Sequence, residues 1–370
     1  MNIGAAFTLI RNGASIKQTD SAGGIPITRI ETIANRVIDR NHMGYADIYN
    51  GDKYSSYFLR DGDILMSHIN SIQHLGKAAI YHPLDEKEKI IHGMNLLVLR
   101  ANQKILDNQF AYFYFSSDSF LHKLPRITKK SVNQASFTVS ELKKIDIPCP
   151  ALSQQHKIAK ILSIIQTLCN KRNEQLKIFD ELVKSRFIEM FGDPIINSLK
   201  LPCKTLSTLC DLKAGIFTSA SEIHEFQSAE NPYPCYGGNG IRGFVDNYTQ
   251  EGKFPIIGRQ GALCGNVQLA SGKFRNTEHA VIVKPKVNLN VIWLYEALIL
   301  ENLNRLHTGA AQPGLAVNTL NQINIPVPSI IEQDKYEHLF IQLDKSKMAV
   351  QKSLDELEIL KKSLMQTYFG

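Results

Sequence analysis

The residues with the clearest chemical potential are the glycines of YGGNGIRG, residues 236–243, which contain the pattern G-x-G-x-x-G. In a dinucleotide site a strand precedes such glycines and a helix begins on them, so that the helix N-terminus meets the pyrophosphate. Here they are followed by FVDNY, residues 244–248, which reads like a strand without helical period. The glycines therefore predict a tight surface loop, in which backbone closely approaches another group, and not a nucleotide site.

The segment NPYP, residues 231–234, lies just upstream and is close to the Asn-Pro-Pro-Tyr of amino-methyltransferases. Its order differs, and a methyltransferase keeps its cofactor loop and its catalytic loop on different strands, far apart in sequence. The sequence also lacks a P-loop and the H-E-x-x-H of zinc hydrolases. Its cysteines and histidines show no metal-ligand spacing. We therefore expect no catalytic residue, no metal and no cofactor in this chain.

The composition is that of an ordinary globular protein, with 370 residues, 44% hydrophobic and 21% charged. The net charge of +7 permits a polyanionic partner without requiring one. The opening residues MNIGAAFTLI lack a basic region followed by a long apolar run, and the most apolar window is too short to span a bilayer. We expect a cytoplasmic protein with no membrane partner.

The chain contains an internal duplication, because residues 134–150 and 312–328 align without a gap and share Gln, Val, Leu, Ile, Ile, Pro and Pro. The same register continues to the Phe-Gly pairs at 191–192 and 369–370. Repeats of this kind mark duplicated structural units. The sequence therefore predicts two variable segments, 1–147 and 194–325, each followed by a shared segment, 148–193 and 326–370.

The shared segments predict two long helices, at about 151–190 and 329–368. Prolines end just before each of them, and apolar residues then recur at alternating steps of three and four, as in a coiled-coil seam. Each helix would be about 60 Å long and would expose its stripe if it stood alone, so we expect the two to pair antiparallel. The alternative is that each helix docks on its own domain. The predicted seam residues are Ile158, Leu162, Ile165, Leu176, Phe179, Val183, Phe340, Leu343, Val350, Leu354, Leu357 and Leu364.

The variable segments read as mixed α/β. Strands bounded by turns are expected at 62–67, 76–81, 94–100, 254–258, 266–269 and 280–284, and helices at 107–124 and 289–306. The fold class is therefore α+β: two similar mixed α/β domains, separated by two long antiparallel helices that form a coiled coil, with a pseudo-two-fold internal repeat.

The whole chain resembles the DNA-specificity subunit of a type I restriction–modification enzyme. The resemblance rests on IPCPALSQQHKI at 147–158 with MFGD at 190–193, IPVPSIIEQDK at 325–335, the glycines at 236–243, GRQGALCG at 258–265, TEHA at 277–280 and GDIL at 62–65. It implies that residues 1–147 and 194–325 are target-recognition domains, each reading one half of a bipartite, asymmetric double-stranded DNA sequence.

The resemblance also implies a set of partners. The paired helices would fix the half-site spacing and dock two methyltransferase subunits, and restriction–translocase subunits would join this core. S-adenosylmethionine, ATP and Mg²⁺ would belong to the partners and not to this chain.

Residue chemistry suggests which side chains contact DNA in such a protein. Arg, Asn, Gln, Ser or His side chains in loops can read base edges, whereas Lys and Arg contact phosphates and carry no sequence information. For each residue alone, a role in a turn or a cap is about as plausible. The predicted base-reading residues are Ser67, His68, Asn70, Gln134, Asn239, Arg242, Arg259, Gln260 and Gln312, and the predicted phosphate contacts are Lys77, Lys129, Lys130, Lys273 and Arg275.

Two other interpretations stay open at this point. The chain could be a coiled-coil scaffold or adaptor whose globular ends bind protein, or a DNA methyltransferase with a divergent cofactor site. DNA binding that falls steeply with salt favours the specificity subunit. Salt-insensitive or absent DNA binding favours the adaptor, and tight binding of S-adenosylmethionine by the isolated chain favours the methyltransferase.

Overall fold

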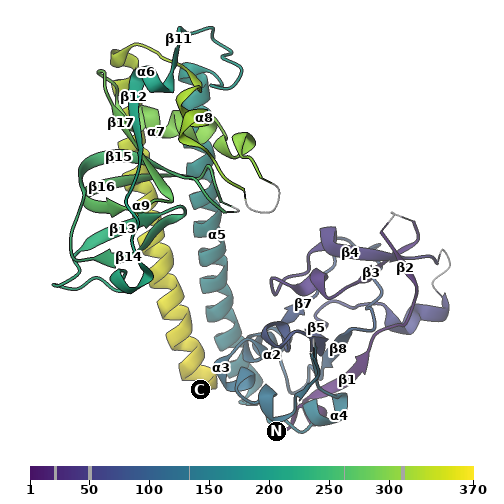
Figure 1. The fold of residues 1–370 in the computed structure, drawn as a ribbon. Coiled ribbons are helices and arrows are strands. Elements are labelled where there is room, and N and C mark those ends of the chain that lie inside the picture. Colours follow the sequence, from purple (N-terminus) through teal and green to yellow (C-terminus); the bar gives the residue numbers. More distant parts are fainter. Residues whose placement is uncertain (21–22, 49–51, 133, 262, 310–312) are drawn as a thin grey trace. The chain divides into compact units, whose positions relative to one another are not determined.

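The structure is a computed structural model that describes residues 1–20, 23–48, 52–132, 134–261, 263–309 and 313–370. The chain divides into two compact units, which we call unit 1 (Met1–Arg172 with Ser353–Gly370) and unit 2 (Asn173–Lys352). Each unit contains one predicted variable segment and one end of each long helix (Figure 1). The sequence predicts separate domains for the long helices and the variable segments, and those boundaries remain predictions.

Unit 1 is built around a four-stranded antiparallel sheet, in which β5, β7 and β8 match the predicted strands and β1 was not predicted. Its strand order is β1 (Phe7–Asn12), β8 (Leu96–Ala101), β5 (Ile64–Ser67) and β7 (Ala78–Ile80). Two smaller sheets accompany it, with the orders β2 (Gln18–Thr19), β4 (Met43–Ala46), β3 (Ile25–Thr28) and β6 (Ile69–Asn70), β10 (Ala135–Ser136), β9 (Lys129–Lys130). The helices are α1 (Ile3–Ala6), α2 (Asn108–Phe115), α3 (Asp118–Leu121) and α4 (Val139–Leu142), with 3₁₀ turns at Glu31–Ile33, Arg40–His42, Asp52–Tyr57, Ile72–His74 and Leu124–Arg126.

Unit 2 repeats this plan with longer strands. Its six-stranded sheet has the order β12 (Cys210–Ala214), β17 (Ala280–Pro285), β15 (Gln250–Gly258), β16 (Val267–Asn276), β13 (Tyr233–Gly237) and β14 (Gly240–Val245), and β13 and β16 run parallel. A separate pair joins β11 (Cys203–Thr205) to β18 (Asn324–Pro326). The helices are α6 (Leu206–Leu209), α7 (Val291–Leu300) and α8 (Val317–Asn321), with 3₁₀ turns at Ala220–Glu222 and Leu303–Leu306.

Both predicted domain helices, 107–124 and 289–306, are broken in the structure. In the second, α7 ends at Leu300 and a separate 3₁₀ turn follows at Leu303–Leu306. In the first, α2 ends at Phe115, and α3 begins after Ser117, whose buried hydroxyl accepts a hydrogen bond from the backbone N–H of Phe120 at 3.3 Å. The hydroxyl group of a serine can hydrogen-bond to nearby backbone groups in place of the helical hydrogen bonds, and here it caps the start of a new helix. The apolar run therefore folds as two short helices on one core.

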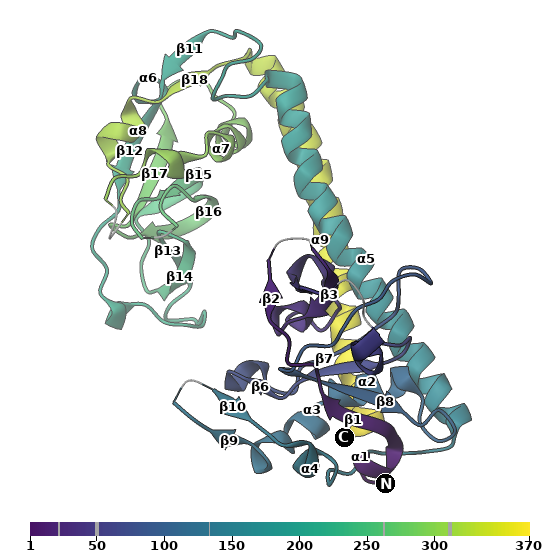
Figure 2. The same cartoon turned by 90° about the vertical axis from the view of Figure 1, so that its right-hand side faces the viewer.

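The two long helices, α5 (Leu152–Phe191) and α9 (Ile330–Phe369), confirm the predicted antiparallel pair (Figures 1 and 2). In unit 1, Lys361 of α9 donates a hydrogen bond to Gln166 of α5. In unit 2, Lys347 of α9 forms an ion pair with Asp180 of α5. Residue numbers thus fall along α9 as they rise along α5. All twelve predicted seam positions are buried or half-buried.

The helices also dock on the globular part of each unit, so the alternative considered above is partly realised. In unit 1, Ile158 and Leu162 of α5 and Phe369 of α9 share one core with Phe110 and Tyr114 of the domain. In unit 2, Phe187 and Phe191 of α5 and Tyr336 of α9 lie in the same core as the fully buried Trp293 of α7. Each core joins a sheet, a domain helix and the helix pair.

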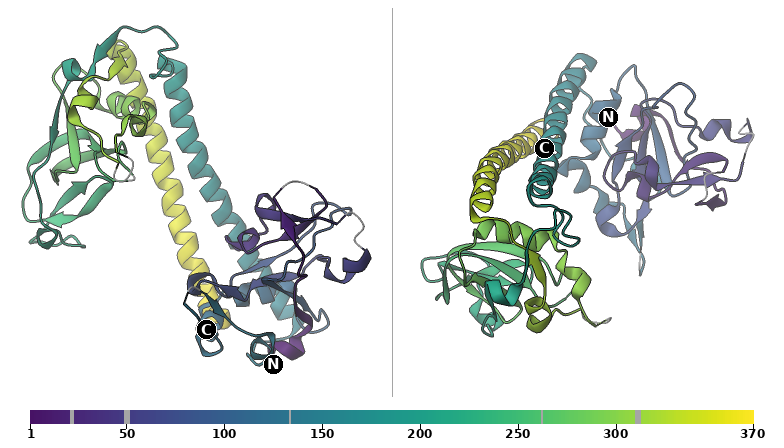
Figure 3. Two further views of the ribbon diagram at one scale, coloured as in Figure 1. Left: turned by 45° about the vertical axis from the view of Figure 1, so that its right-hand side comes forward. Right: turned by 90° about the horizontal axis from the view of Figure 1, so that it is seen from above.

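A duplicated glutamine explains part of this docking. The Gln155 side chain accepts a hydrogen bond from the N–H of Asp107 at 2.9 Å and donates one to the carbonyl of Pro150 at 2.7 Å. Asp107 is the N-cap of α2. Gln333 does the same in unit 2: it accepts from the N–H of Asn290, the N-cap of α7, at 2.9 Å and donates to Pro328 at 2.9 Å. Each glutamine therefore fixes the start of a domain helix against a long helix. Figure 3 shows the two long helices in two further views, α5 in teal and α9 in yellow.

Candidate functional site

The same backbone turn follows β5 in unit 1 and β15 in unit 2. In unit 1, Gly76 N–H donates to the carbonyl of Ser67 at 2.8 Å, and Ser67 N–H donates to the carbonyl of Lys77 at 2.9 Å. In unit 2, Gly265 N–H donates to the carbonyl of Gly258 at 2.7 Å, and Gly258 N–H donates to Asn266 at 2.9 Å. Gly76 and Gly265 both have positive φ, at 75° and 88°, a conformation that glycine adopts without strain. Ser67 and Gly258 are therefore equivalent positions.

The equivalence extends to the next residues. The carbonyl of His68 accepts a hydrogen bond from Phe137 N–H at 3.1 Å, and the carbonyl of Arg259 accepts one from Leu315 N–H at 2.8 Å. Phe137 and Leu315 are themselves partners in the sequence duplication. We call residues 67–77 and 258–265 the reading loops, because five predicted base-reading residues fall on them: Ser67, His68, Asn70, Arg259 and Gln260.

In unit 2 the reading loop borders a cleft of about 570 Å³. The turn between β13 and β14 lines its other side, and the structure brings three predicted base-reading residues together here: Asn239, Arg242 and Gln260. All three side chains are exposed. Among the described residues, Asn239 receives a hydrogen bond from the Asn266 amide at 3.2 Å, and Arg242 has no hydrogen bond or ion pair. Amide and guanidinium groups in a cleft of this kind can donate to and accept from base edges.

The predicted surface loop at 236–243 is a hairpin in which the tight turn is residues 238–239, because the flanking residues belong to β13 and β14. Some of its glycines lie against other backbone, as predicted. A Cβ added to Gly258 would stand 1.9 Å from the carbonyl oxygen of Gly238, so β15 and the β13–β14 turn meet without side chains between them. Gly240, with φ at 95°, closes the turn. This close approach is what places Asn239 and Arg242 beside Gln260.

His279 also lines this cleft and was missing from the predicted site residues. Its carbonyl accepts a hydrogen bond from the N–H of Arg259 at 3.0 Å, and its imidazole Nε2 lies 3.1 Å from Glu278 Oε1. His279 belongs to the motif TEHA at 277–280, which carries the resemblance to the family together with GRQGALCG at 258–265. Nothing in the spacing of the two motifs showed that they face one cleft.

In unit 1 the equivalent loop borders a smaller cavity of about 220 Å³, which Ser67, Asn70 and Lys77 line. The Asn70 amide donates to Ser67 Oγ at 3.2 Å, and Lys77 Nζ donates to the carbonyl of Ala34 at 2.8 Å. His68 lies apart from this group: its ring is buried edge-on against Phe137, at 6.4 Å between ring centroids, and burial lowers its pKa. Of the three predicted base-reading residues in this loop, Asn70 is half-exposed, whereas Ser67 and His68 are buried.

Two predicted phosphate contacts, Lys129 and Lys130, are exposed on β9, next to β10 and β6 (Figure 2). Gln134, also exposed, follows them in the same hairpin, where its carbonyl accepts from the Ser131 N–H at 2.8 Å. Because β6 is part of the reading loop and β10 separates it from β9, this hairpin places two cations one strand away from the loop. Gln312, the counterpart of Gln134, lies outside the described residues.

The other two predicted phosphate contacts, Lys273 and Arg275, lie on β16 and do not line the cleft. Lys273 is exposed with its ammonium 4.8 Å from the Tyr248 ring centroid, and its hydrogen bond to Tyr248 raises its pKa. Arg275 is 7% exposed and pairs with Glu222 at 3.3 Å. That burial favours a structural role for Arg275, and the phosphate contacts of both residues stay predictions.

Two broad features of the described residues complete this picture. No group of three or more His, Cys, Asp or Glu among them is placed to hold a metal ion. In the same part of the chain, no helix has both the length and the apolar character that crossing a membrane requires.

Comparisons with known proteins agree with the duplicated architecture. Residues 2–178 and 204–358 match the family described as type I restriction modification DNA specificity domain. The putative type I restriction enzyme MjaX specificity subunit of Methanocaldococcus jannaschii is 28% identical over 381 residues, covering 96% of this chain and 89% of that protein. The EcoprrI specificity subunit of Escherichia coli is 34% identical over 241 residues, covering 61% of this chain and 58% of that one.

The fold has a solved counterpart. The S subunit of a type I restriction–modification system from M. genitalium aligns with a TM-score of 0.68 and 18% identity, covering all of this chain and 95% of the other. With two family matches that together span most of the sequence, each covering one variable segment and much of the long helix that follows it, this chain belongs to the type I restriction–modification DNA specificity family.

Proposed function

We propose that this chain is the non-catalytic, sequence-reading subunit of a type I restriction–modification complex. The observation that carries the proposal is the pair of reading loops, which have one backbone hydrogen-bond pattern and different side chains. Unit 1 presents Asn70 where unit 2 presents Arg259, Gln260 and the Asn239–Arg242 turn. Two similar readers with unlike side chains suit an asymmetric, bipartite DNA target.

The helix pair would set the distance between the two half-sites. α5 and α9 each run from one unit into the other. A rigid connection between reading elements makes half-site spacing a geometric property of the protein. The same helices would dock two methyltransferase subunits, to which restriction–translocase subunits would bind.

The chemistry would reside in those partners. S-adenosylmethionine would bind the methyltransferase subunits, and ATP with Mg²⁺ would bind the restriction–translocase subunits. This chain would supply DNA sequence recognition and assembly in the cytoplasm. An adaptor that binds only protein would not need polar, exposed side chains gathered in a cleft beside a reading loop, as Asn239, Arg242 and Gln260 are in unit 2.

Arg242→Ala is expected to relax recognition at one base position in one half-site. A lost base-edge contact costs about 1–3 kcal/mol of discrimination, whereas the other half-site keeps its reader. Methylome sequencing of a host that carries this chain and its methyltransferase gives the bipartite motif, and the variant should broaden it at one position. Lys253→Ala, an exposed change on β15 outside the cleft, should leave the motif intact. An unchanged motif in the Arg242 variant would remove Arg242 from the reading set.

The double variant Lys129→Ala/Lys130→Ala is expected to weaken DNA binding on every sequence. Each phosphate contact contributes a slope of about 0.9 to the fall of log affinity with log salt, so losing two lowers the slope by about 2. Filter binding of the complex with its methyltransferase, across a salt series, measures this. Lys87→Ala/Lys89→Ala removes two exposed charges from another turn and should keep the wild-type slope. Equal slopes in all three proteins would assign the β9 lysines another role.

A further inference from the structure

Unit 2 contains a cavity of about 330 Å³ where α7 meets α5 and α9, and Glu296 of α7 lines it. The Glu296 side chain is 6% exposed, and among the described residues it makes no hydrogen bond and no ion pair. Its carboxyl group lines the cavity, and Lys347 interacts with it electrostatically without forming an ion pair. A largely buried carboxyl group without a hydrogen-bond partner is costly, so proteins seldom keep one without a use. The cavity has room for on the order of ten water molecules, which leaves space beside Glu296 for another group.

The equivalent position in unit 1 shows how unusual Glu296 is. Asn290 and Asp107 are the N-caps of α7 and α2, and the duplicated glutamines hold both. Counted from these caps, Glu296 corresponds to Phe113, which is 2% exposed in the core of unit 1. A buried phenylalanine satisfies this site structurally. The carboxyl group of Glu296 is therefore not required by the fold that the two units share.

The lining of the cavity suits a cation. Phe179, Tyr295 and Phe340 contribute aromatic rings, and Asp344 adds a second carboxylate. The remaining acid, Asp180, already forms an ion pair with Lys347, and Lys184 is exposed at the surface. Aromatic faces attract ammonium and guanidinium groups, and a carboxylate forms with them the strongest hydrogen bonds that proteins make.

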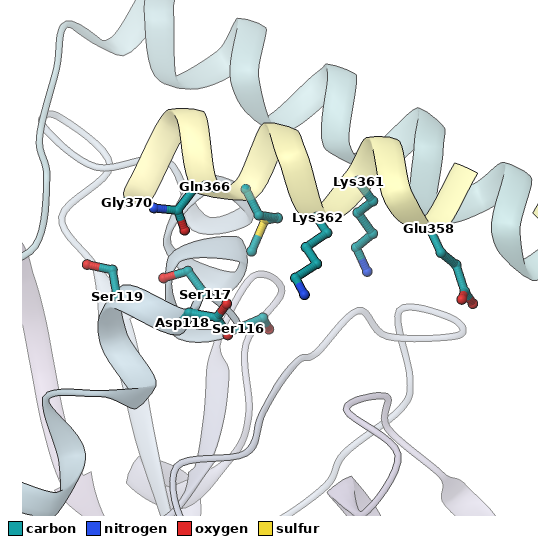
Figure 4. A pocket seen from close by; sticks show the side chains of 10 residues that line it. Ser116, Ser117, Asp118, Ser119, Glu358, Lys361, Lys362, Gln366 and Gly370 are labelled. Atoms are coloured by element: carbon teal, nitrogen blue, oxygen red, sulfur yellow. The ribbon is translucent and has the colours of Figure 1, made fainter. Parts of the chain in front are cut away.

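A hollow occurs at the matching place in unit 1, with a volume of about 300 Å³. Glu358 and Lys362 of α9 line it, and in the duplicated frame these are the positions of Asp180 and Lys184 of α5. Figure 4 shows Lys361 and Lys362 extending from α9 toward the segment that carries Ser116–Ser119. Each unit thus has a depression at partly equivalent positions, although the one in unit 1 is lined by α9 and not by α5. Two such depressions fit a partner that is present in two copies, and the Glu296 carboxyl distinguishes one of them.

We propose that the Glu296 cavity receives a basic side chain, arginine or lysine, of the methyltransferase subunit that docks on unit 2. This inference rests on the proposed function, because it takes its partner from there. The entering cation gives Glu296 the partner that it lacks in the free chain. It also makes docking on unit 2 chemically different from docking on unit 1, where Phe113 stands in its place.

The test compares the full-length wild-type chain with Glu296→Gln and with the matched control Glu181→Gln, an exposed change on α5 that does not line the cavity. Each is titrated with the purified cognate methyltransferase subunit, and sedimentation velocity gives stoichiometry and affinity. We expect the wild type and the control to bind two copies. In Glu296→Gln, one binding step should weaken at least about tenfold while the other is unchanged, as for the loss of one member of a buried charge pair.

Three outcomes distinguish a failure of the proposed docking site from a failure of the proposed function. Wild-type affinity at both steps in Glu296→Gln overturns the cavity as a docking site and leaves the proposed function standing. Failure of the wild type to bind the methyltransferase overturns the proposed function. Equal weakening by Glu181→Gln shows a general charge effect and also overturns the specific site. Asp344→Asn, an exposed change in the cavity rim, provides a second variant and should weaken the same step by a smaller factor.

Discussion

Replacing Tyr336 with alanine is expected to lower the free energy of unfolding by about 4 kcal/mol. The side chain is completely buried near the start of α9. Its ring meets Phe187 at 5.3 Å and Phe191 at 5.6 Å between centroids, both nearly edge to face, and both belong to the end of α5. Alanine would therefore lose apolar burial and aromatic contacts and leave a cavity at the point where the two long helices meet.

Two control variants separate packing from other effects. Tyr336→Phe keeps the ring and loses only a long hydrogen bond, 3.4 Å from the hydroxyl to the carbonyl of Val183, so it should cost about 1 kcal/mol or less. Met348→Ala changes a side chain of the same helix that is 66% exposed, and should stay within about 0.5 kcal/mol of the wild type. Urea unfolding followed by circular dichroism measures all three. A phenylalanine variant as unstable as the alanine variant would show that the hydroxyl group, and not the packing, dominates.

Tyr336 also shows what the sequence could predict well. Its position belongs to the stripe that recurs at alternating steps of three and four, and such a pattern reports burial on one helix face whatever the tertiary context. Even the polar positions in that stripe are explained by pairing, because Lys347 meets Asp180 and Lys361 meets Gln166. The gap-free duplication placed both helices in the same register. Local periodicity and internal repetition were therefore sufficient to predict the two long helices and their pairing.

The reading loops were less predictable, because loops have no period that separates buried from exposed residues. Ser67 and Gly258 hold equivalent places through backbone hydrogen bonds. Such bonds do not require a particular amino acid, so the sequence does not reveal the equivalence. His68 was an attractive reader by chemistry, yet its ring lies in the core beside Phe137. His279 reaches the unit 2 cleft from the start of β17, a neighbour that only sheet topology reveals.

The roles of the buried polar residues were the other feature that the sequence did not predict. Gln155 and Gln333 were visible as a duplicated pair, but their role requires knowing that each faces the N-cap of a domain helix. Glu296 lies in the most apolar window of the chain, residues 291–300, and the sequence alone predicted no role for it. The structure shows that this window, α7, packs on the sheet and the helix pair at once, and that Ile299 is its exposed residue. Position 296 lies among the buried positions of α7, so its charged residue is buried with them.

Glu296→Gln is expected to stabilise the free chain, and the gain should depend on pH. Burial raises the pKa of Glu296 to about 7 from its ordinary 4.5, so the folded protein holds this proton more tightly than the unfolded chain does. The stabilisation from the bound proton is complete below pH 4.5 and is lost as the pH rises through 7. Glutamine never ionises. The variant should therefore match the wild type near pH 4.5 and exceed it at pH 8 by on the order of 3 kcal/mol.

Urea unfolding of the two proteins at several pH values between 4.5 and 8 measures this difference directly. Asp180, Lys347, Asp344, Tyr295 and Tyr336 also lie around the cavity or interact with Glu296, and their contributions cancel to first order because both proteins contain them. Glu181→Gln removes an exposed carboxylate and should give no pH-dependent difference. A constant offset between wild type and Glu296→Gln would mean that Glu296 is ionised throughout and has a partner in the free chain. A gain in stability of the free chain, together with weaker binding of the methyltransferase, is the pattern of a residue kept for assembly at the expense of the fold.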